Sequence, residues 1–490
     1  MRAWPLALWM AGVWGEPSPR IPPEARPNLG RSGDPTKWGV ANQPWAEGAR
    51  EGRRRLFTSP ARRTDPHGGT AARRQELLLC ISRMLNSGRS RRRFGRAGIR
   101  LLAARRRSRA IDSGRGMPHP IPISPAPLAP KGRDRALSRV LTAVERVGEA
   151  LQPLPAVPLT PRRLVALKSC CLGDALEATP LLGALRRAYP EARLVAGVGR
   201  WSRPALLNNP DLDGLLDLED VGIGRPDPGA YARVVRRLRA GRFDLALALD
   251  RTPLLTTLPL LAGIPVRAGI DSAGRGFALN VRVPWAVVEQ EAALFLRVGR
   301  ALGVSTDDAR LRFVPVADDV ATVGRLWGEA GLEGARAVAL APGGGQNPGM
   351  TLQAKRWPPA RYAALADRLH EEHGLRVVLA GSQDDAAVAA EVRRLARAPV
   401  TNLAGRTTSF GALGALFARC VLFVGNDAGP MHLAAAVGTP VVAVFGPTDP
   451  AVYAPYSARV ATLRGPRGES TEEVGVDEVA AAAAQLLARA

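Results

Sequence analysis

The sequence predicts an α/β protein with two consecutive doubly wound domains, each a parallel sheet covered by helices. From Arg162 onward, short apolar runs alternate with stretches of helical periodicity, which is the pattern of βαβ units. The alternation forms two series, at 160–315 and 330–490, and each is about one domain long. Glycines and charged residues follow several of the apolar runs, at the sheet edge where such folds bind ligands.

The first series, residues 160–315, predicts five strands. The run ALEATPLLGALRRAY at 175–189 repeats its apolar residues every three or four positions, which indicates a helix with one buried face. The expected strands are 163–168, 192–199, 214–218, 243–250 and 266–270, and the expected helices are 175–189, 230–241 and 289–303.

The second series, residues 330–490, repeats the pattern. Its final stretch, VDEVAAAAAQLLARA, consists mainly of strong helix formers. The expected strands are 335–342, 375–381, 401–405, 421–426 and 441–446, and the expected helices before the final one are 361–374, 385–396, 410–420 and 430–438.

Residues 1–135 differ in character and predict a basic, disordered extension. Arginine clusters alternate with Pro and Gly, and only 73–86 has the spacing of a short amphipathic helix. Two alternatives are a basic arm that binds RNA or anionic lipid, and a natural start at Met117. Pro5 and the lack of a small-x-small cleavage site argue against a signal peptide in the first twenty residues.

The net charge of +24 suggests at first a nucleic-acid-binding protein. Residues 1–116, however, hold 25 Lys and Arg against 8 Asp and Glu, a net charge of +17, so only +7 remains for residues 117–490. We therefore expect no specific nucleic-acid partner for the globular part. No apolar run reaches the roughly 18 residues that span a bilayer, so an integral membrane protein is not expected.

The four cysteines are Cys80, Cys170, Cys171 and Cys420. They show neither a CxxC motif nor a Cys/His ligand spacing, so no structural metal is expected. Cys170 and Cys171 are adjacent, and such a pair is not expected to bridge to itself. These features favour a reducing compartment.

The first segment of chemical interest is SCCLGD, between the strand that ends at Lys168 and the following helix. Asp174 is expected at the N-cap or in the first turn of that helix, where a carboxylate caps amides and suits the helix dipole. Alternatively, it takes a proton from an acceptor hydroxyl. Ser169 and Gly173 would then line the acceptor loop, with Gly173 allowing a close backbone approach.

A second segment, APGGGQNPGMTLQAKRWPP, follows the first strand of the second series. The backbone amides of Gly344 and Gly345 can hold phosphate, and Lys355 can add positive charge. The segment matches neither the Walker loop nor GxGxxG. A surface turn is the alternative.

The third segment, GNDAGPMH, ends another strand and begins a helix whose amides form an anion site. His432 lies in the first turn of this helix and is expected to contact a ligand, the alternative being a local cap. Asp427 would repel phosphate, so a sugar hydroxyl is its expected partner.

These three segments resemble those of glycosyltransferase family 9, the lipopolysaccharide core heptosyltransferases. The likeness runs from about Arg162 to the C-terminus, in the order KSCCLGDALEATP, APGGG with KRWPPARY, and GNDAGPMHLAAAVGTPVVAVFGPTDP. It implies the GT-B fold, in which two Rossmann-like domains face a cleft, with the acceptor domain at 160–315 and the donor domain at 330–490. Residues 1–135 have no counterpart in the family.

The resemblance also implies roles for single residues. Asp174 would be the catalytic base, and Lys355, shortly before a Trp-Pro pair, would contact the donor phosphates. An acidic residue after the strand at 375–381 would read the nucleotide ribose, and both Asp384 and Asp385 are candidates. The donor-site element Asp-x-Gly-x-x-His corresponds to Asp427, Gly429 and His432, with Ala428 where Ser or Thr is common.

Two departures from the family pattern concern these loops. Some family members have hydroxyl residues ahead of the phosphate lysine, whereas this loop has Gly344 and Gly345, with Thr351 as its only hydroxyl. Cys170 and Cys171 replace residues that are usually small or polar.

The activity implied is transfer of heptose from ADP-heptose to a Kdo or heptose hydroxyl of the inner core, with inversion and without metal or cofactor. The acceptor would be lipid-linked, and the enzyme a cytoplasmic monomer. Contact with the inner membrane through basic side chains is a further hypothesis, against the alternative of an ordinary solvated face. The side chains concerned, all expected to be exposed, are those of Arg186, Arg187, Arg233, Arg236, Arg237 and Arg239.

Other functions were weighed against this one. The same fold could use another nucleotide sugar for a different surface glycan. A non-catalytic nucleotide- or RNA-binding protein would lack a base in the first loop, yet Asp174 is present. A dinucleotide oxidoreductase is disfavoured, because no strand is followed by GxGxxG with an acidic residue about 20 positions later.

Overall fold

The computed structural model describes residues 160–223, 227–347 and 350–489, all of which belong to one compact unit of the chain. The expectations for residues 1–135, including the helix at 73–86, lie outside the described residues. Within the described ranges, no helix is both long and apolar enough to cross a membrane.

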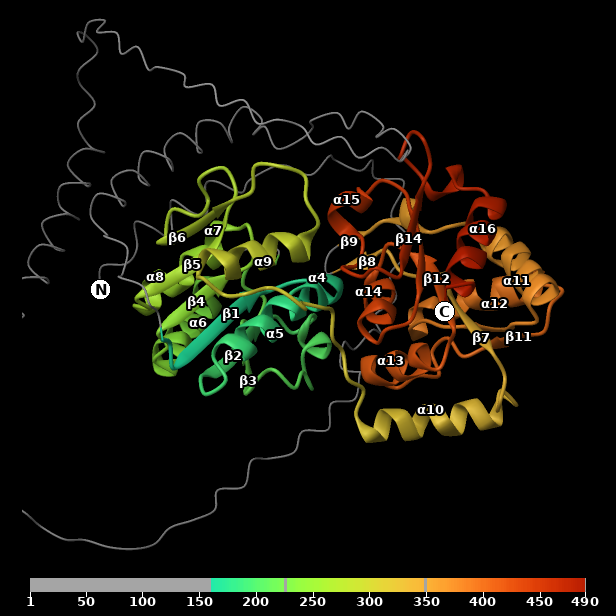
Figure 1. Cartoon of the computed structure of the whole chain (residues 1–490), viewed down its shortest axis with the longest axis horizontal. Helices are drawn as coiled ribbons and strands as arrows, with labels where there is room; N and C mark the ends of the chain where they lie inside the picture. Colours follow the sequence, from blue (N-terminus) through green and yellow to red (C-terminus); the bar gives the residue numbers. More distant parts are fainter. Residues whose placement is uncertain (1–159, 224–226, 348–349, 490) are drawn as a thin grey trace, which may run out of the picture. The chain divides into compact units, whose positions relative to one another are not determined.

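The first sheet has six parallel strands in the order β3-β2-β1-β4-β5-β6 (Figure 1). The five predicted strands are confirmed, but the edge strand β6 was missed because its four residues follow a glycine-rich turn and end in proline. The strands are β1 (Arg163–Lys168), β2 (Arg193–Val198), β3 (Gly214–Asp217), β4 (Leu245–Ala248), β5 (Val266–Asp271) and β6 (Val281–Pro284).

Helices cover both faces of this sheet, because alternate residues of β1 point to opposite sides. Leu164 packs with one group of helices and Val165 with the other. The first group is α4 (Leu172–Glu177), α5 (Thr179–Ala188) and α9 (Glu291–Ala301), and the second is α6 (Pro228–Gly241), α7 (Pro253–Thr256) and α8 (Leu258–Ala262).

The helix predicted at 175–189 is in fact two helices. The chain leaves α4 at Ala178 and enters α5, which has Pro180 in its first turn. Proline has no N–H to donate and suits a helix start, so the break occurs just before it. Because of this break, α4, which contains Asp174, is a separate short helix.

The second sheet also has six parallel strands, in the order β11-β10-β7-β12-β13-β14. The predicted strands are confirmed, and β14 at the edge was missed. The strands are β7 (Ala337–Ala341), β10 (Arg376–Leu379), β11 (Val400–Asn402), β12 (Leu422–Asn426), β13 (Val441–Phe445) and β14 (Val460–Arg464), with a separate hairpin of β8 (Gln346–Asn347) and β9 (Met350–Thr351).

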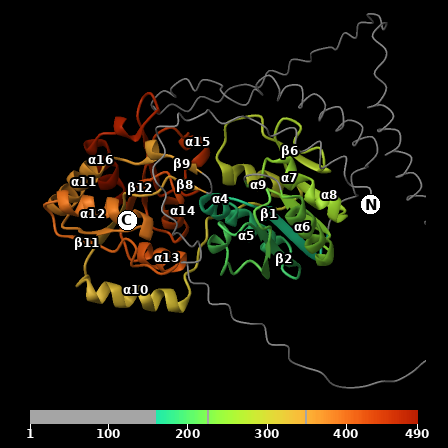
Figure 2. The same ribbon diagram turned by 180° about the vertical axis from the view of Figure 1, so that it is seen from behind.

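Two groups of helices cover the second sheet. On one face lie α11 (Pro359–His373), α12 (Ala386–Leu395) and α16 (Val476–Leu487), and on the other α10 (Ala317–Glu329), α13 (Phe410–Ala418) and α14 (Gly429–Ala436). Both views show α10, which was not predicted, beside α13 (Figures 1 and 2). The shorter helices are α15 (Pro450–Tyr453), η2 (Arg203–Ala205), η3 (Gln353–Lys355), η4 (Gln383–Asp385) and η5 (Thr471–Glu473).

Each sheet has a point where the strand order reverses, between β1 and β4 in the first and between β7 and β12 in the second. Loops diverge there at the carboxyl ends of the strands, and such points bind ligands in doubly wound folds. All three segments of chemical interest follow strands next to these points, namely β1, β7 and β12.

Candidate active site

The loop after β1 contains a disulfide between Cys170 and Cys171. The peptide bond between the two residues is cis, and their Cα atoms are 3.1 Å apart. The expectation that this pair does not bridge to itself is therefore wrong, because the two sulfurs come together across the shortened Cα distance.

Lys168, at the end of β1, is the centre of a buried charge cluster. Its ammonium lies 3.0 Å from Asp174 and 3.0 Å from Asp250, and 3.9 Å from Glu291. Burial opposes the charged form, but these three carboxylates outweigh it and raise the pKa of Lys168 above its ordinary value. Lys168 is therefore a fixed cation next to Asp174.

Asp174 lies in the first turn of α4, as predicted, but it is not the N-cap. The N-cap is Cys171, and no side chain caps the helix. The Asp174 carboxylate instead binds Lys168, and 31% of the side chain remains exposed. A partly exposed carboxylate held in one orientation is suited to accept a proton from a bound hydroxyl.

Ser169 is buried, and both its amide and its hydroxyl donate to Asp250, at 2.7 and 3.0 Å. Its carbonyl accepts a hydrogen bond from the Ser202 hydroxyl at 2.7 Å. Ser169 thus fixes the shape of the loop. Sequence reasoning missed Asp250, although a carboxylate at the end of the apolar run FDLALALD, next to β1, was the available signal.

Glu291 and Arg251 complete the first side of the site. Burial and the charge of Asp174 raise the pKa of Glu291 to about 7, against the opposing effect of Lys168 and Arg251. The Arg251 guanidinium lies 4.1 Å from the centre of the Trp285 ring, which favours a cation–π contact. Sequence reasoning missed these residues because they belong to no motif.

The glycine loop after β7 is held by side chains of neighbouring loops. Gly344 and Gly345 have φ angles of +97° and +75°, which glycine adopts without strain. The Gly344 amide donates to Asp385 at 3.1 Å, and its carbonyl accepts from the Arg356 guanidinium at 2.8 Å. The Gly344 amide is thus already engaged, so this loop is built as a fixed support.

The two candidate acids after β10 have different environments. Asp385 is buried, and its carboxylate also accepts from the amide and hydroxyl of Ser382. Asp384 is exposed and borders a pocket of about 480 Å³ that Arg356 and Trp357 also line. Of the two, only Asp384 has its side chain open to solvent.

Lys355 and Asp427 form a partly buried ion pair with 2.6 Å between nitrogen and oxygen. The Thr448 hydroxyl donates to the same oxygen of Asp427. Lys355 thus offsets the negative charge that made Asp427 an unfavourable neighbour for phosphate. Thr448 was missed, although it lies in the quoted segment GPTDP.

Trp357 and Asn426 fix the position of this pair. Trp357 is fully buried, and its amide donates to the Asn426 side chain at 3.0 Å. The Asn426 amide group in turn donates to the carbonyls of Pro342 and Gly343, at 3.1 and 2.8 Å. The ends of β7 and β12 are thereby joined beside the Lys355–Asp427 pair.

The first turn of α14 contacts the loops on both sides of the site. A Cβ on Gly344 would lie 2.6 Å from the Cβ of Ala428, and a Cβ on Gly429 would lie 3.5 Å from that of Leu172. Because Ala428 and Gly429 are small, α14 approaches both the glycine loop and α4 closely.

His432 in α14 is buried, and its Nδ1 lies 2.8 Å from a carboxylate oxygen of Glu177 in α4. Burial would lower the pKa of His432, but the hydrogen bond and charge of Glu177, with the charges of Asp427 and Asp174, raise it. The ring also packs against Gly173, where a Cβ would lie 2.5 Å from Cδ2. Gly173 therefore makes room for His432. Sequence reasoning missed Glu177.

Most of the basic side chains expected to face a membrane form ion pairs or hydrogen bonds with other residues of the chain. Arg186 is half-buried and pairs with Asp213 at 2.6 Å, so its prediction as an exposed residue is wrong. Arg233 and Arg237 both pair with Glu219. Arg187 and Arg239 donate to backbone carbonyls. These interactions are those of an ordinary solvated helix face.

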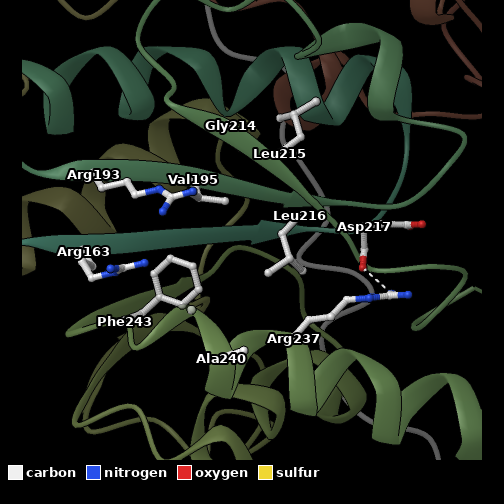
Figure 3. A pocket seen from close by; sticks show the side chains of 11 residues that line it. Arg163, Arg193, Val195, Gly214, Leu215, Leu216, Asp217, Arg237, Ala240 and Phe243 are labelled. Atoms are coloured by element: carbon white, nitrogen blue, oxygen red, sulfur yellow. Dashed lines mark hydrogen bonds between the residues drawn. The ribbon is translucent and has the colours of Figure 1, made fainter. Parts of the chain in front are cut away.

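A pocket of about 480 Å³ lies elsewhere on the first sheet (Figure 3). It is lined by Arg163 and Arg193, the first residues of β1 and β2, and by Phe243 before β4. In Figure 3 Arg237 reaches the Asp217 carbonyl beside it. The pocket includes the amino ends of these strands, whereas Asp174 follows the carboxyl end of β1, so it is no part of the candidate active site.

Comparisons with known proteins show the family of this chain. The sequence model of glycosyltransferase family 9 (heptosyltransferase) matches residues 231–480. The chain is 31% identical over 300 residues to lipopolysaccharide heptosyltransferase 3 of Escherichia coli, covering 58% of this chain and 84% of that protein. It is 29% identical over 318 residues to lipooligosaccharide heptosyltransferase 2 of Haemophilus influenzae, covering 61% and 87%.

Among solved structures, E. coli ADP-heptose lps heptosyltransferase II superposes with a TM-score of 0.54 at 26% identity, covering 67% of this chain and 99% of that one. The family match contradicts the alternative of a non-catalytic binding protein. With two parallel sheets whose loops carry the family's motifs, the chain belongs to glycosyltransferase family 9 and is a glycosyltransferase of the GT-B fold.

Proposed function

We propose that this enzyme transfers heptose from ADP-heptose to a Kdo or heptose hydroxyl of a lipopolysaccharide inner-core saccharide. The observation that carries the proposal is the pairing of Asp174, a partly exposed carboxylate, with the buried cation Lys168 at the end of β1. The related lipopolysaccharide and lipooligosaccharide heptosyltransferases, and the solved E. coli ADP-heptose lps heptosyltransferase II, support the choice of donor and acceptor class.

The reaction is a single displacement with inversion at the anomeric carbon. As the acceptor oxygen forms its bond to that carbon, the bond to the phosphate oxygen breaks and ADP leaves. Asp174 accepts the acceptor's proton. Lys168 keeps its own proton, because three carboxylates surround it, so it orients Asp174 without competing as a base.

The departing diphosphate is stabilised by Lys355 and by the first amides of α14 around Gly429. Lys355 is held against Asp427 at 2.6 Å, so its charge is placed before the donor binds. In this proposal Asp427 also accepts a hydrogen bond from a sugar hydroxyl, and Asp384 accepts one from the nucleotide ribose. No metal or cofactor is required by the reaction as written.

Further parts of the proposal concern the setting of the enzyme. We place it in the cytoplasm as a monomer that meets a lipid-linked acceptor at the inner membrane. The second candidate is transfer from another nucleotide sugar to a different surface glycan, which would use the same base and the same diphosphate site.

The experiment measures ADP release by the purified full-length protein with ADP-heptose and a core-oligosaccharide acceptor. Acceptor-dependent turnover that persists with a chelator is expected. Asp174→Asn should lower kcat by about 10²–10⁴-fold, as for loss of a general base. Asp220→Asn, which changes an exposed carboxylate of the same domain, should leave turnover unchanged.

UDP-sugars and GDP-sugars form the comparison arm. Faster turnover with one of them would mean that this sugar, and not ADP-heptose, is the donor. The assignment of Asp174 as the base would still stand. If Asp174→Asn retained the wild-type rate, Asp174 would not be the base.

A further inference from the structure

Glu177 is a buried carboxylate within the first motif segment, and neither the roles implied by the motifs nor the mechanism above includes it. It lies in α4 and accepts hydrogen bonds from three parts of the chain: His432 Nδ1 at 2.8 Å, Gln290 Nε2 at 2.6 Å and the Tyr456 amide at 3.4 Å. Only His432 among these donors can carry a charge. Since a buried carboxylate is costly without a counter-charge, Glu177 and a protonated His432 stabilise each other.

The imidazole is fixed from both sides by one face of α4. Gly173 and Glu177 are four residues apart in this helix, so they lie on the same face. Glu177 binds Nδ1, while the opposite ring edge, with Cδ2 and Nε2, packs against Gly173. The orientation of the ring is therefore set by α4, the helix that also carries Asp174.

The second ring nitrogen, Nε2, remains available. Within the described residues Nε2 has no hydrogen-bond partner. It is not fully buried, so it is accessible from the surface. With Nδ1–H donating to the Glu177 carboxylate, Nε2 carries a second hydrogen when the ring is an imidazolium, and that hydrogen can be donated to an anion.

The charges that face His432 come from α4 and from the loop between β12 and α14. Glu177 and Asp174 face it from α4, and Asp427 faces it from the loop before α14. Lys355 is bound to Asp427, and the neighbouring Gln290 is uncharged. Glu177 makes the direct contact, and it is the main reason that the pKa of His432 is raised in spite of burial.

We propose that Glu177 is a positioning residue that holds His432 as an imidazolium with Nε2–H free to donate to the diphosphate of the nucleotide sugar. This proposal rests on the proposed function for the identity of the donor. It assigns to Glu177 a role in transfer through His432, with no contact of its own to the substrate.

The test compares wild type with Glu177→Gln in the full-length protein. The glutamine keeps the shape of the side chain and an oxygen that can accept from Nδ1, but removes the charge. NMR of ¹³C-labelled histidines, with His432→Gln to assign the signal among the five, should show the His432 pKa lower by about one unit or more in the variant.

The activity profile should move with this titration. In wild type the diphosphate loses a charged donor as pH rises through the His432 pKa, so kcat/KM falls on the alkaline side. In Glu177→Gln this alkaline fall should begin about one pH unit lower, so kcat/KM on the alkaline limb of the profile should be about tenfold below wild type. Glu177→Asp, which keeps the charge, should retain more of the wild-type profile.

The control is Asp367→Asn, which removes the charge of another buried carboxylate, one that lies in α11 and binds Arg397. It should leave the His432 titration and the pH profile unchanged. An unchanged His432 pKa in Glu177→Gln, or an unchanged alkaline fall in kcat/KM, would overturn the proposal. If Glu177→Gln does not fold, Glu177→Asp decides: an alkaline fall in kcat/KM that follows the His432 titration of that variant supports the proposal, and a mismatch between the two overturns it.

The outcome also separates this proposal from the function it rests on. If wild type does not use ADP-heptose, the proposed function fails. The NMR titration with and without ADP still tests whether Glu177 sets the charge of His432 and whether a diphosphate perturbs its signal.

Discussion

Gly173 and His432 are in direct contact, and a Cβ at position 173 would lie 2.5 Å from Cδ2 and 2.9 Å from Nε2 of the ring. Carbon atoms do not approach so closely, so any side chain at position 173 must displace the imidazole. The glycine of the family's Gly-Asp pair is thereby tied to the histidine of the third motif.

Gly173→Ala should therefore lower kcat/KM by about 10²-fold, since a displacement of about 1 Å in a catalytic group can have that effect. Asp174 keeps its place in α4, so the loss should come from the donor side and appear as weaker ADP binding. Gly214→Ala is the matched control, because a Cβ there meets nothing within 4 Å. ADP titration by calorimetry checks both variants, and equal affinity in Gly173→Ala would contradict the argument.

Lys168→Met should destabilise the protein strongly. The substitution leaves Asp174, Asp250 and Glu291 without their shared cation, and breaking a buried ion pair from one side costs about 3–5 kcal/mol. Urea unfolding measures the change. Arg406→Met removes an exposed ion pair to Glu329 and should cost about 1 kcal/mol or less, and a loss as small in Lys168→Met would show that the cluster is not needed for stability.

Glu291 should make the free energy of unfolding depend on pH. Its pKa is raised to about 7 by burial and by Asp174, so between pH 4.5 and 7 the folded protein binds a proton that the unfolded chain has lost. Stability from this group therefore falls as pH rises through that window. The stability of Glu291→Gln relative to wild type should increase from pH 5 to pH 8.

Urea titrations of both proteins at several pH values check this prediction. Asp213→Asn is a useful comparison, because the pKa of Asp213 is lowered by its hydrogen bonds to Leu194 and Arg186, which outweigh its burial. Its contribution is lost as pH falls, which is the opposite direction. A difference between Glu291→Gln and wild type that does not vary with pH would refute the assignment.

The sequence predicted the parts of the fold that depend on local pattern. The central strands are uniformly apolar runs, so β1, β7, β12 and β13 were placed within two residues at each end. The edge strands β6 and β14 were missed, because a short, half-buried strand has too few apolar residues to form a pattern. The break before Pro180 was visible in the sequence, but the helical periodicity on both sides of it concealed two helices.

The sequence predicted the positions of those candidate site residues that belong to motifs. Asp174, Lys355 and Asp427 follow strands beside the switch points, as expected from the sequence. Their partners could not be found in this way: Glu177 meets His432, and Glu291 meets Lys168, only after both sheets have formed. A single sequence contains a recognisable pattern for a loop. It contains almost no pattern for two distant residues that meet only in the tertiary structure.

Asp384 and Asp385 are adjacent in sequence but should respond to substitution in different ways. Asp385 holds the Gly344 amide and Ser382, and no Cβ fits at Gly343 because Asp385 lies within 2.0 Å of that position. Asp385→Ala should therefore lower the melting temperature and impair donor binding together, because the glycine loop loses its support.

Asp384 is exposed and supports no loop, so Asp384→Ala should leave the melting temperature unchanged. If it reads the nucleotide ribose, the variant should raise the KM for the donor about tenfold, the loss expected for about 1.4 kcal/mol from a hydrogen bond to a charged group. Glu391→Ala, at the border of the same pocket, is the matched control and should not change KM. An unaltered donor KM in Asp384→Ala would leave ribose recognition to another residue, because Asp385 is already occupied by the protein.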